Sequence, residues 1–161
     1  MLGKWDEYHK QRREYGNPES YRIASEWLCG YGPVEDWGCG TRAAEKYLAP
    51  SRYTGIDGSG RFADVKADLT KYTSDTHCIL MRHVLEHNAE WSLILRNALN
   101  SFRNRMAVVL FMKPEEPERL LWMQGDIPNI HIGKSRLMSL MEPYLKKTVE
   151  EGDEICFLLE K

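Results

Sequence analysis

The spacing of apolar and polar residues changes several times along the 161-residue chain. Short apolar runs bounded by glycine, proline or aspartate predict strands, and longer segments with apolar residues three or four positions apart predict helices. The predicted strands cover residues 34–37, 53–56, 64–67, 78–81, 106–112, 146–150 and 155–159. The predicted helices cover residues 4–15, 18–28, 41–48, 89–102 and 136–144.

The order of these elements predicts the architecture. Strands alternate with helices as far as residue 112, which favours right-handed crossovers and an open α/β sheet, mostly parallel, with helices on both faces. The run Met106–Met112 is continuously apolar, as expected of a parallel strand covered on both sides. Only Glu151–Asp153 separates the last two strands, so they must form an antiparallel hairpin.

Two segments can cover a ligand on this core or simply complete its packing. The helix at residues 4–15 carries Tyr8 and Tyr15 and can fold over the sheet as a lid. The proline-rich connection 114–133 is expected to contain one helical turn around Arg119–Met123, and its Trp122 can form the other wall.

Composition narrows the class of protein. With 42% hydrophobic residues, 29% charged residues and a formal charge of -2, the chain is expected to be one soluble domain over residues 1–161. No apolar run approaches the roughly 18 residues of a membrane span, and the N-terminus lacks the apolar core of a signal peptide, so we expect a cytoplasmic protein. The near-neutral charge argues against a nucleic-acid surface. The cysteines form no CxxC pair, so neither a metal site nor a disulfide framework is predicted.

The glycine-rich turn carries the strongest functional signal. Gly38 and Gly40 follow one predicted strand and precede a helix, where open α/β sheets bring their backbone against a nucleotide-like ligand. A tight turn without a ligand would also need glycines. Asp57, at the end of the second strand, is placed to bind both hydroxyls of a ribose. Together these residues predict a cofactor that contains adenosine.

Two classes of cofactor share this arrangement. Gly38-x-Gly40-x-x-Ala43 satisfies a loose dinucleotide fingerprint, so a nicotinamide enzyme has to be considered. Asp36 argues against it, because a carboxylate at the mouth of the site would repel a diphosphate. S-adenosylmethionine has no phosphate and presents an ammonium and a sulfonium, so the acid favours this cofactor. A dinucleotide fold also needs a second mononucleotide-binding half, and the terminal hairpin does not resemble one.

Four segments, taken together, are similar to the class I S-adenosylmethionine-dependent methyltransferase family. They are VEDWGCGT (34–41), YTGIDGS (53–59), ADL (67–69) and CILMRHVLEH (78–87). The resemblance covers about residues 18–161. It implies a Rossmann-like open twisted sheet that ends in an antiparallel hairpin. It also implies a division of the single domain into N-terminal helices (1–30), a cofactor-binding half (34–112) and a substrate-side half (113–161).

The resemblance assigns roles to particular residues. The implied cofactor contacts are Asp36, Gly38, Cys39, Gly40, Asp57, Gly58, Asp68, Leu69, Arg82 and His83. Asp57 would hold the ribose hydroxyls, and Asp68 would bind the adenine amino group with Leu69 beside the ring. Arg82 and His83 would border the methionine end and the acceptor.

The chain departs from the family pattern at two places. Arg42 stands where the third glycine is usual, and we expect its side chain to point into solvent. The strand 78–81 lacks the acid that many relatives carry. The Asn/Asp-Pro-Pro-aromatic motif and the proline-cysteine nucleophile are both absent, which excludes the two most recognisable DNA-modifying subclasses.

Methyl transfer is an in-line displacement, so the protein mainly aligns the reactants in a desolvated pocket. A general base is needed only if the acceptor loses a proton early. His83 is the first candidate, although it could instead bond the backbone or the cofactor, and His131 is the second. Glu86 and His87 are expected to fix the start of the following segment.

The expected function is therefore transfer of a methyl group from S-adenosylmethionine to an oxygen or nitrogen on a small molecule or saccharide, which leaves S-adenosylhomocysteine. No metal, membrane or nucleic-acid partner is expected. Because few residues are left to cap the acceptor site, a second copy of the chain in a homodimer is one candidate to complete it. Two alternatives stay open: a catalytically silent methyltransferase-like module that binds a protein partner, and a nicotinamide-dependent oxidoreductase.

Overall fold

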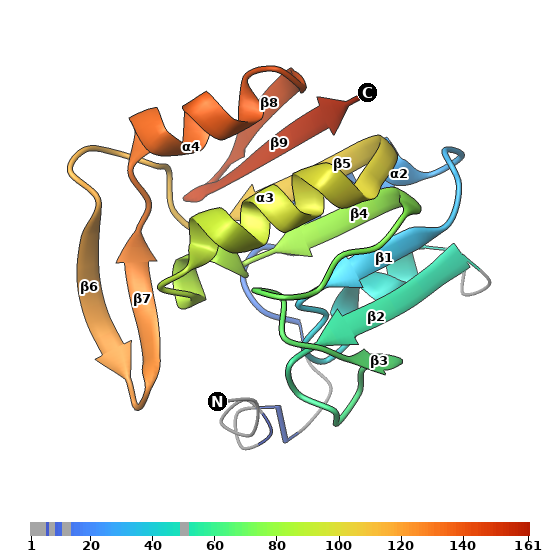
Figure 1. Ribbon diagram of the computed structural model, residues 1–161, viewed down its shortest axis with the longest axis horizontal. Coiled ribbons are helices and arrows are strands. Elements are labelled where there is room, and N and C mark those ends of the chain that lie inside the picture. Colours follow the sequence, from blue (N-terminus) through green and yellow to red (C-terminus); the bar gives the residue numbers. More distant parts are fainter. Residues whose placement is uncertain (1–5, 7–8, 11–13, 49–51) are drawn as a thin grey trace.

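The structure is a computed structural model that describes residues 6, 9–10, 14–48 and 52–161. In this part of the chain a seven-stranded sheet of order β3-β2-β1-β4-β5-β9-β8 forms the centre of the molecule (Figure 1). Its strands are β1 (Val34–Trp37), β2 (Tyr53–Asp57), β3 (Val65–Lys66), β4 (Thr76–Arg82), β5 (Phe102–Leu110), β8 (Leu145–Glu151) and β9 (Glu154–Glu160). Strands β1 to β5 run parallel, whereas β9 is antiparallel to both β5 and β8. The predicted sheet with its terminal hairpin is confirmed.

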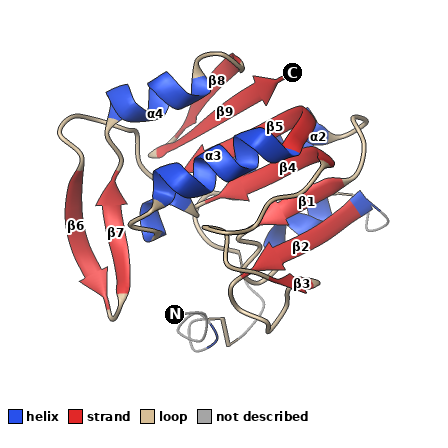
Figure 2. Cartoon of the chain, viewed as in Figure 1, coloured by secondary structure: helices blue, strands red, loops and turns tan. Residues whose placement is uncertain are grey.

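Helices cover both faces of this sheet (Figure 2). The elements α3 (Trp91–Ser101) and α4 (Lys134–Met141) pack on one face, and α2 (Pro18–Leu28) and the 3-10 helix η1 (Ala43–Tyr47) pack on the other. Successive residues of β5 alternate between the two cores: Met106 and Val108 face α3 and α4, and Ala107 and Val109 face α2. This double burial explains the uninterrupted apolar run in the sequence.

The start of α2 agrees with the prediction. The Asn17 side chain accepts a hydrogen bond of 2.9 Å from the backbone N–H of Glu19, and Pro18 occupies the first turn, where its missing N–H costs nothing. The helix buries Tyr21 and Leu28 against the sheet. Its N-terminal end therefore reaches the carboxyl edge of the strands in a defined position.

Two predicted helices begin differently from the expectation. Arg42 takes a left-handed φ of 61°, so helical geometry starts only at Ala43 and the short segment that remains forms a 3-10 helix. Asn88 does not cap α3, because its side chain donates to the carbonyl of Val84 at 2.6 Å, and Glu90 takes the N-cap position instead. The element η3 (Leu85–His87) precedes this junction.

The helical turn predicted around Arg119–Met123 is wrong. The segment forms an antiparallel hairpin of β6 (Arg119–Gln124) and β7 (Ile127–His131), which turns at Gly125 with φ 59°. A register shift between Leu120 and Trp122 interrupts the alternation by which a strand is recognised in sequence. The hairpin stands away from the main sheet, and β7 packs against η3 (Figure 1).

The N-terminal helix predicted over residues 4–15 falls mostly outside the described residues. Asp6 is helical, whereas residues 9–10 and 14–15 are not, so a helix does not extend to Tyr15. Within the described ranges, no helix is both long enough and apolar enough to cross a membrane.

Candidate functional site

A cavity of about 1400 Å³ opens at the carboxyl ends of the parallel strands, the edge where open α/β sheets bind ligands. All ten residues predicted to contact a cofactor line it. They are Asp36, Gly38, Cys39, Gly40, Asp57, Gly58, Asp68, Leu69, Arg82 and His83. The cavity continues past η3 to the β6–β7 hairpin and to the turn between β8 and β9.

The glycine-rich turn is held tightly against the end of β2. The backbone N–H groups of Gly38 and Cys39 both donate to the Ile56 carbonyl, at 2.7 and 3.1 Å. Gly38 has a φ of 78°, and a Cβ there would lie 2.3 Å from Val84 Cγ2. Both the backbone conformation and the space therefore require glycine.

Asp57 connects this turn to β2. One carboxylate oxygen, Oδ2, accepts from the Gly40 N–H at 2.9 Å, and Oδ1 accepts from the Ser59 N–H at 2.6 Å. The side chain is buried, and burial raises the pKa of Asp57. Each oxygen uses one of its two acceptor positions, so the carboxylate can accept further hydrogen bonds from a ligand.

Asp36 lines the floor of the cavity as a buried group. Its Oδ2 accepts a 2.6 Å hydrogen bond from the Tyr53 hydroxyl. Burial raises the pKa of Asp36 to about 7, although the hydrogen bond from Tyr53 acts in the opposite direction. The repulsion of a diphosphate by Asp36 is therefore weaker at neutral pH than the sequence argument assumes.

Arg42 does not point into solvent, contrary to the prediction. Its side chain is 11% exposed and forms ion pairs with Glu45 at 2.8 Å and Asp64 at 2.7 Å. The guanidinium also lies 4.9 Å from the centre of the Tyr53 ring. These contacts hold a left-handed backbone conformation that glycine would adopt without strain.

Asp68 and Leu69 lie just after β3. The Oδ1 atom of Asp68 accepts both the hydroxyl and the backbone N–H of Thr70, at 2.7 and 3.0 Å. These hydrogen bonds lower the pKa of Asp68, the hydroxyl having the larger effect. Oδ1 is thus committed to Thr70, whereas no described residue bonds to Oδ2.

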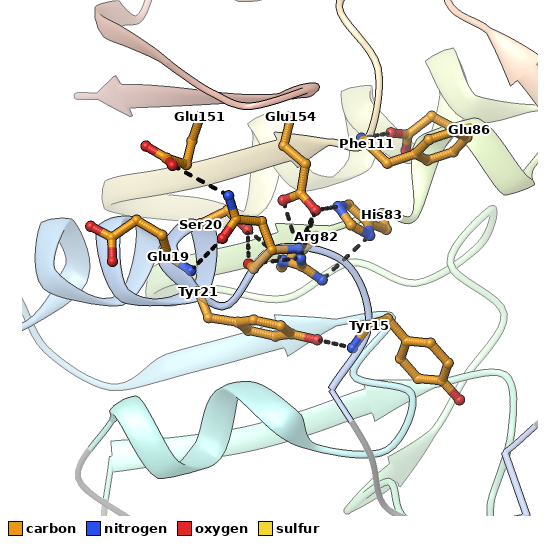
Figure 3. Close-up of polar contacts among 11 residues, drawn as sticks. Tyr15, Glu19, Ser20, Tyr21, Arg82, His83, Glu86, Phe111, Glu151 and Glu154 are labelled. Carbon is orange, nitrogen blue, oxygen red and sulfur yellow. Dashed lines mark hydrogen bonds and ion pairs between the residues drawn. The ribbon is translucent and has the colours of Figure 1, made fainter.

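A buried group of polar residues lies where β4 ends and β9 begins, beside the start of α2 (Figure 3). Arg82 Nη2 lies 3.1 Å from each oxygen of Glu154, and the two side chains are only 4% and 6% exposed. The Arg82 Nε donates to Ser20 Oγ at 3.0 Å, and the guanidinium lies 3.7 Å from the centre of the Tyr21 ring. Glu154 also accepts from the backbone N–H of Asn17 at 2.7 Å. We call this group the Arg82–Glu154 cluster.

Sequence reasoning missed Glu154. Burial alone would raise the pKa of this acid, but the contacts with His83, Ser20 and the Asn17 N–H outweigh it and lower the pKa to about 2. Glu154 is therefore ionised at all moderate pH values. One acid at the start of an otherwise apolar strand was the only signal in the sequence.

His83 belongs to the same cluster. Its Nδ1 lies 3.3 Å from Arg82 Nη1, and its Nε2 lies 3.3 Å from Glu154 Oε1 without the alignment of a full hydrogen bond. A guanidinium can only donate, so Nδ1 is the unprotonated nitrogen and Nε2 carries the proton. Burial lowers the pKa of His83 and keeps the ring neutral. The lone pair thus faces Arg82, which opposes the predicted role of His83 as a general base.

His87 has the other tautomer. Its Nδ1 lies 3.3 Å from the carbonyl oxygen of Pro128, which can only accept, so Nδ1 carries the proton. The ring stacks on Phe111 at 5.5 Å and lines the cavity, and burial lowers its pKa. His131, the second base candidate from sequence, bonds the Lys113 carbonyl through Nε2 at 2.8 Å and does not line the cavity.

Glu86 gives a testable dependence of stability on pH. The side chain is 1% exposed, its Oε1 accepts from the Phe111 N–H at 2.5 Å, and burial raises its pKa to about 8 (Figure 3). Ionisation is thus easier in the unfolded chain, so stability falls as pH rises from about 4.5 towards 8. Glu86→Gln should therefore increase the urea midpoint at pH 8.5 and change it little at pH 5. An equal effect at both pH values would contradict this assignment.

No protein-family model and no curated protein matches this chain, but solved structures do. The 1,6-didemethyltoxoflavin-N1-methyltransferase of Burkholderia thailandensis, solved with 1,6-didemethyltoxoflavin and S-adenosylhomocysteine, has a TM-score of 0.66 and 16% identity over 88% of this chain and 78% of its own. Magnesium protoporphyrin IX methyltransferase of Synechocystis PCC 6803, with bound S-adenosylmethionine, has a TM-score of 0.67 and 12% identity, and the match covers 97% of this chain and 89% of its own. An S-adenosylmethionine-dependent methyltransferase of Mesorhizobium loti has a TM-score of 0.63 and 11% identity, and the match covers 86% of this chain and 96% of its own. At these identities the likeness shows a shared fold.

Proposed function

Because the chain has the class I methyltransferase fold, we propose that it binds S-adenosylmethionine and transfers the methyl group to an oxygen or nitrogen of a small molecule. One observation carries this proposal: the glycine-rich turn, Asp57 and Asp68 come from three strand ends and meet in one cavity. Among the similar structures, one is an N-methyltransferase and another, the mitomycin 7-O-methyltransferase, an O-methyltransferase.

The residues present fit the cofactor. The turn at Gly38 and Gly40 offers backbone without side chains, against which a ligand can lie closely. The two acceptor positions left on Asp57 match the two hydroxyls of a ribose. Oδ2 of Asp68 is available for an amino group such as that of adenine.

The charges in this half of the cavity favour a cofactor without phosphate. Asp57 and Asp68 line it, Asp36 is partly protonated near neutral pH because burial raises its pKa to about 7, and Arg82 is already paired with Glu154. Among the described residues no lysine lines the cavity. A diphosphate would lack a partner here, whereas an ammonium and a sulfonium would be attracted.

The cofactor supplies a methyl group made electrophilic by the adjacent sulfonium. The chain then has to align the acceptor and exclude water. Val84 and Phe111 supply apolar surface beside the methionine end, and the Arg82–Glu154 cluster holds the segment Gly16–Asn17 over it. Where the acceptor must lose a proton, His87 is the base we propose, since its Nε2 is the unprotonated nitrogen of the neutral ring.

Calorimetry on the full chain tests the cofactor. S-adenosylhomocysteine and S-adenosylmethionine should each bind at one site per chain, and NADH should give no fluorescence enhancement on mixing. Absence of heat at millimolar S-adenosylhomocysteine, with the protein shown to be folded by circular dichroism, would refute the proposal and leave the silent binding module. Enhancement of NADH fluorescence would instead support the nicotinamide enzyme.

A further inference from the structure

The cavity has room for a second ligand. Its volume of about 1400 Å³ exceeds the roughly 300–1,000 Å³ typical of a site for one small molecule. The half farther from the glycine-rich turn is bounded by η3, Phe111, the β6–β7 hairpin and the β8–β9 turn. None of the cofactor contacts assigned above comes from the hairpin. The residues of this half can therefore bind a different ligand.

The hairpin presents apolar side chains to this space. Leu120, Trp122 and Met123 line the cavity and are 57%, 51% and 50% exposed. Half-exposed apolar side chains of this size, gathered on one short strand, are typical of a surface that a ligand or partner covers. The pairing register sets Trp122 directly opposite Asn129, and opposite residues of an antiparallel pair project from the same face.

Asn129 is a second, independent indication of a ligand. The residue lines the cavity and is 3% exposed, yet its buried Nδ2 donates no hydrogen bond to any described residue. Its neighbours hold the strand in place, because the Pro128 carbonyl contacts His87 and Ile130 packs into the core. A buried amide without a partner is uncommon in folded proteins and needs an explanation. A ligand in the cavity would supply the missing partner.

The charges around this half are predominantly negative. We define the acidic rim as Glu90, Glu118 and Asp153, all of which are exposed and line the cavity. Among the described residues, the arginines that line the cavity are Arg119 and Arg82, and Arg82 is paired with Glu154. The closest basic group to Glu118 is that of Arg136, at 3.5 Å and largely exposed. A cleft lined by one sign of charge attracts ligands of the opposite sign.

We propose that the space between the β6–β7 hairpin and η3 binds an aromatic or apolar molecule that carries a protonated amine. Trp122 provides the apolar contact, Asn129 a hydrogen bond, and the acidic rim the attraction for the ammonium group. The proposal rests on the proposed function only in so far as this molecule would be the methyl acceptor. Its binding does not require the transfer.

Three probes that share a naphthalene ring and carry a positive, a neutral or a negative polar group test this inference. 1-Naphthylmethylamine, 1-naphthylmethanol and 1-naphthoate are titrated calorimetrically into the full chain, with and without saturating S-adenosylhomocysteine. The amine should bind at least tenfold more tightly than the carboxylate, with the alcohol between them, and added salt should narrow the difference. Equal or tighter binding of naphthoate, or no binding of any probe, would overturn the proposal. A preference for the amine in a chain that does not bind S-adenosylhomocysteine would refute the cofactor and leave this site standing.

Variants separate the three contributions. Trp122→Ala should weaken all three probes by a similar factor of about ten, and Trp122→Phe should retain most of the affinity. The double change Glu90→Gln/Asp153→Asn should reduce the preference for the amine and leave naphthylmethanol unaffected. Asp75→Asn is the control, because this exposed acid pairs with Arg103 and does not line the cavity.

Asn129→Leu provides a readout that a structural role would not produce. Nδ2 has no partner to lose among the described residues, so the urea midpoint should stay the same or rise while binding of the amine weakens. A loss of stability with unchanged binding would remove Asn129 from the site.

Discussion

Replacing Glu154 with alanine should lower the free energy of unfolding by about 3–5 kcal/mol, the range measured when one partner of a buried ion pair is removed. Arg82, which is 4% exposed in the intact pair, would lose its carboxylate partner, and the Asn17 N–H would lose its acceptor. Urea unfolding at pH 7, followed by circular dichroism, measures the change.

The neighbouring strand supplies a matched control. Glu150 pairs with Lys113 at 2.7 Å, but both side chains are about half exposed, so Glu150→Ala should cost less than about 1 kcal/mol. The double change Arg82→Met/Glu154→Leu removes both buried charges and should recover most of the stability lost in the single variant. If Glu154→Ala costs no more than Glu150→Ala, the cluster does not stabilise the fold as we describe.

Glu154→Ala should also change how the free energy of unfolding depends on pH in the acid range. The folded pKa of Glu154, about 2, lies below its ordinary value of 4.5. Its ionisation therefore stabilises the folded state above pH 4.5, and this contribution is lost as pH falls towards 2. The alanine variant should lose less stability than the parent protein over that range.

Asp57→Asn should weaken binding of S-adenosylhomocysteine by about 100-fold. The amide replaces one acceptor oxygen by a donor, so one ribose hydroxyl loses a hydrogen bond to a charged group, which is worth about 1.5–3 kcal/mol. The new NH₂ would also face the N–H of Gly40 or Ser59, both of which need an acceptor. Calorimetry measures the affinity of the variant, and unfolding curves show how much of it remains folded.

Asp64→Asn is the matched control for this change. Asp64 likewise accepts a backbone N–H, that of Gly55 at 2.8 Å, but it does not line the cavity. Asparagine keeps an oxygen that can accept from Arg42, which also pairs with Glu45, so this substitution should leave the affinity within about twofold of the parent protein. Parent-like affinity of Asp57→Asn would show that Asp57 does not hold the ribose.

Local signals predicted most of the sheet and half of the cavity. Asn17-Pro18 is sufficient to start α2, and the short turn before Glu154 permits only a hairpin. The glycine-rich turn, Asp57 and Asp68 all lie at the ends of strands or just beyond them, so their meeting follows once the strands are parallel. These features depend on neighbours along the chain and are therefore readable from the sequence.

The sequence alone thus determined the α/β architecture and the half of the cavity at the strand ends. The tertiary structure decided the buried ion pair and the protonation of the histidine beside it, because contacts between distant segments set these features. Arg82 and Glu154 are 72 positions apart, and only their burial together selects the tautomer of His83. The β6–β7 hairpin is a local element, but its register shift hides the strand period from the sequence. Periodicity records which face of an element is buried, whereas partners across the fold are chosen by packing, hydrogen bonding and charge, which no local pattern contains.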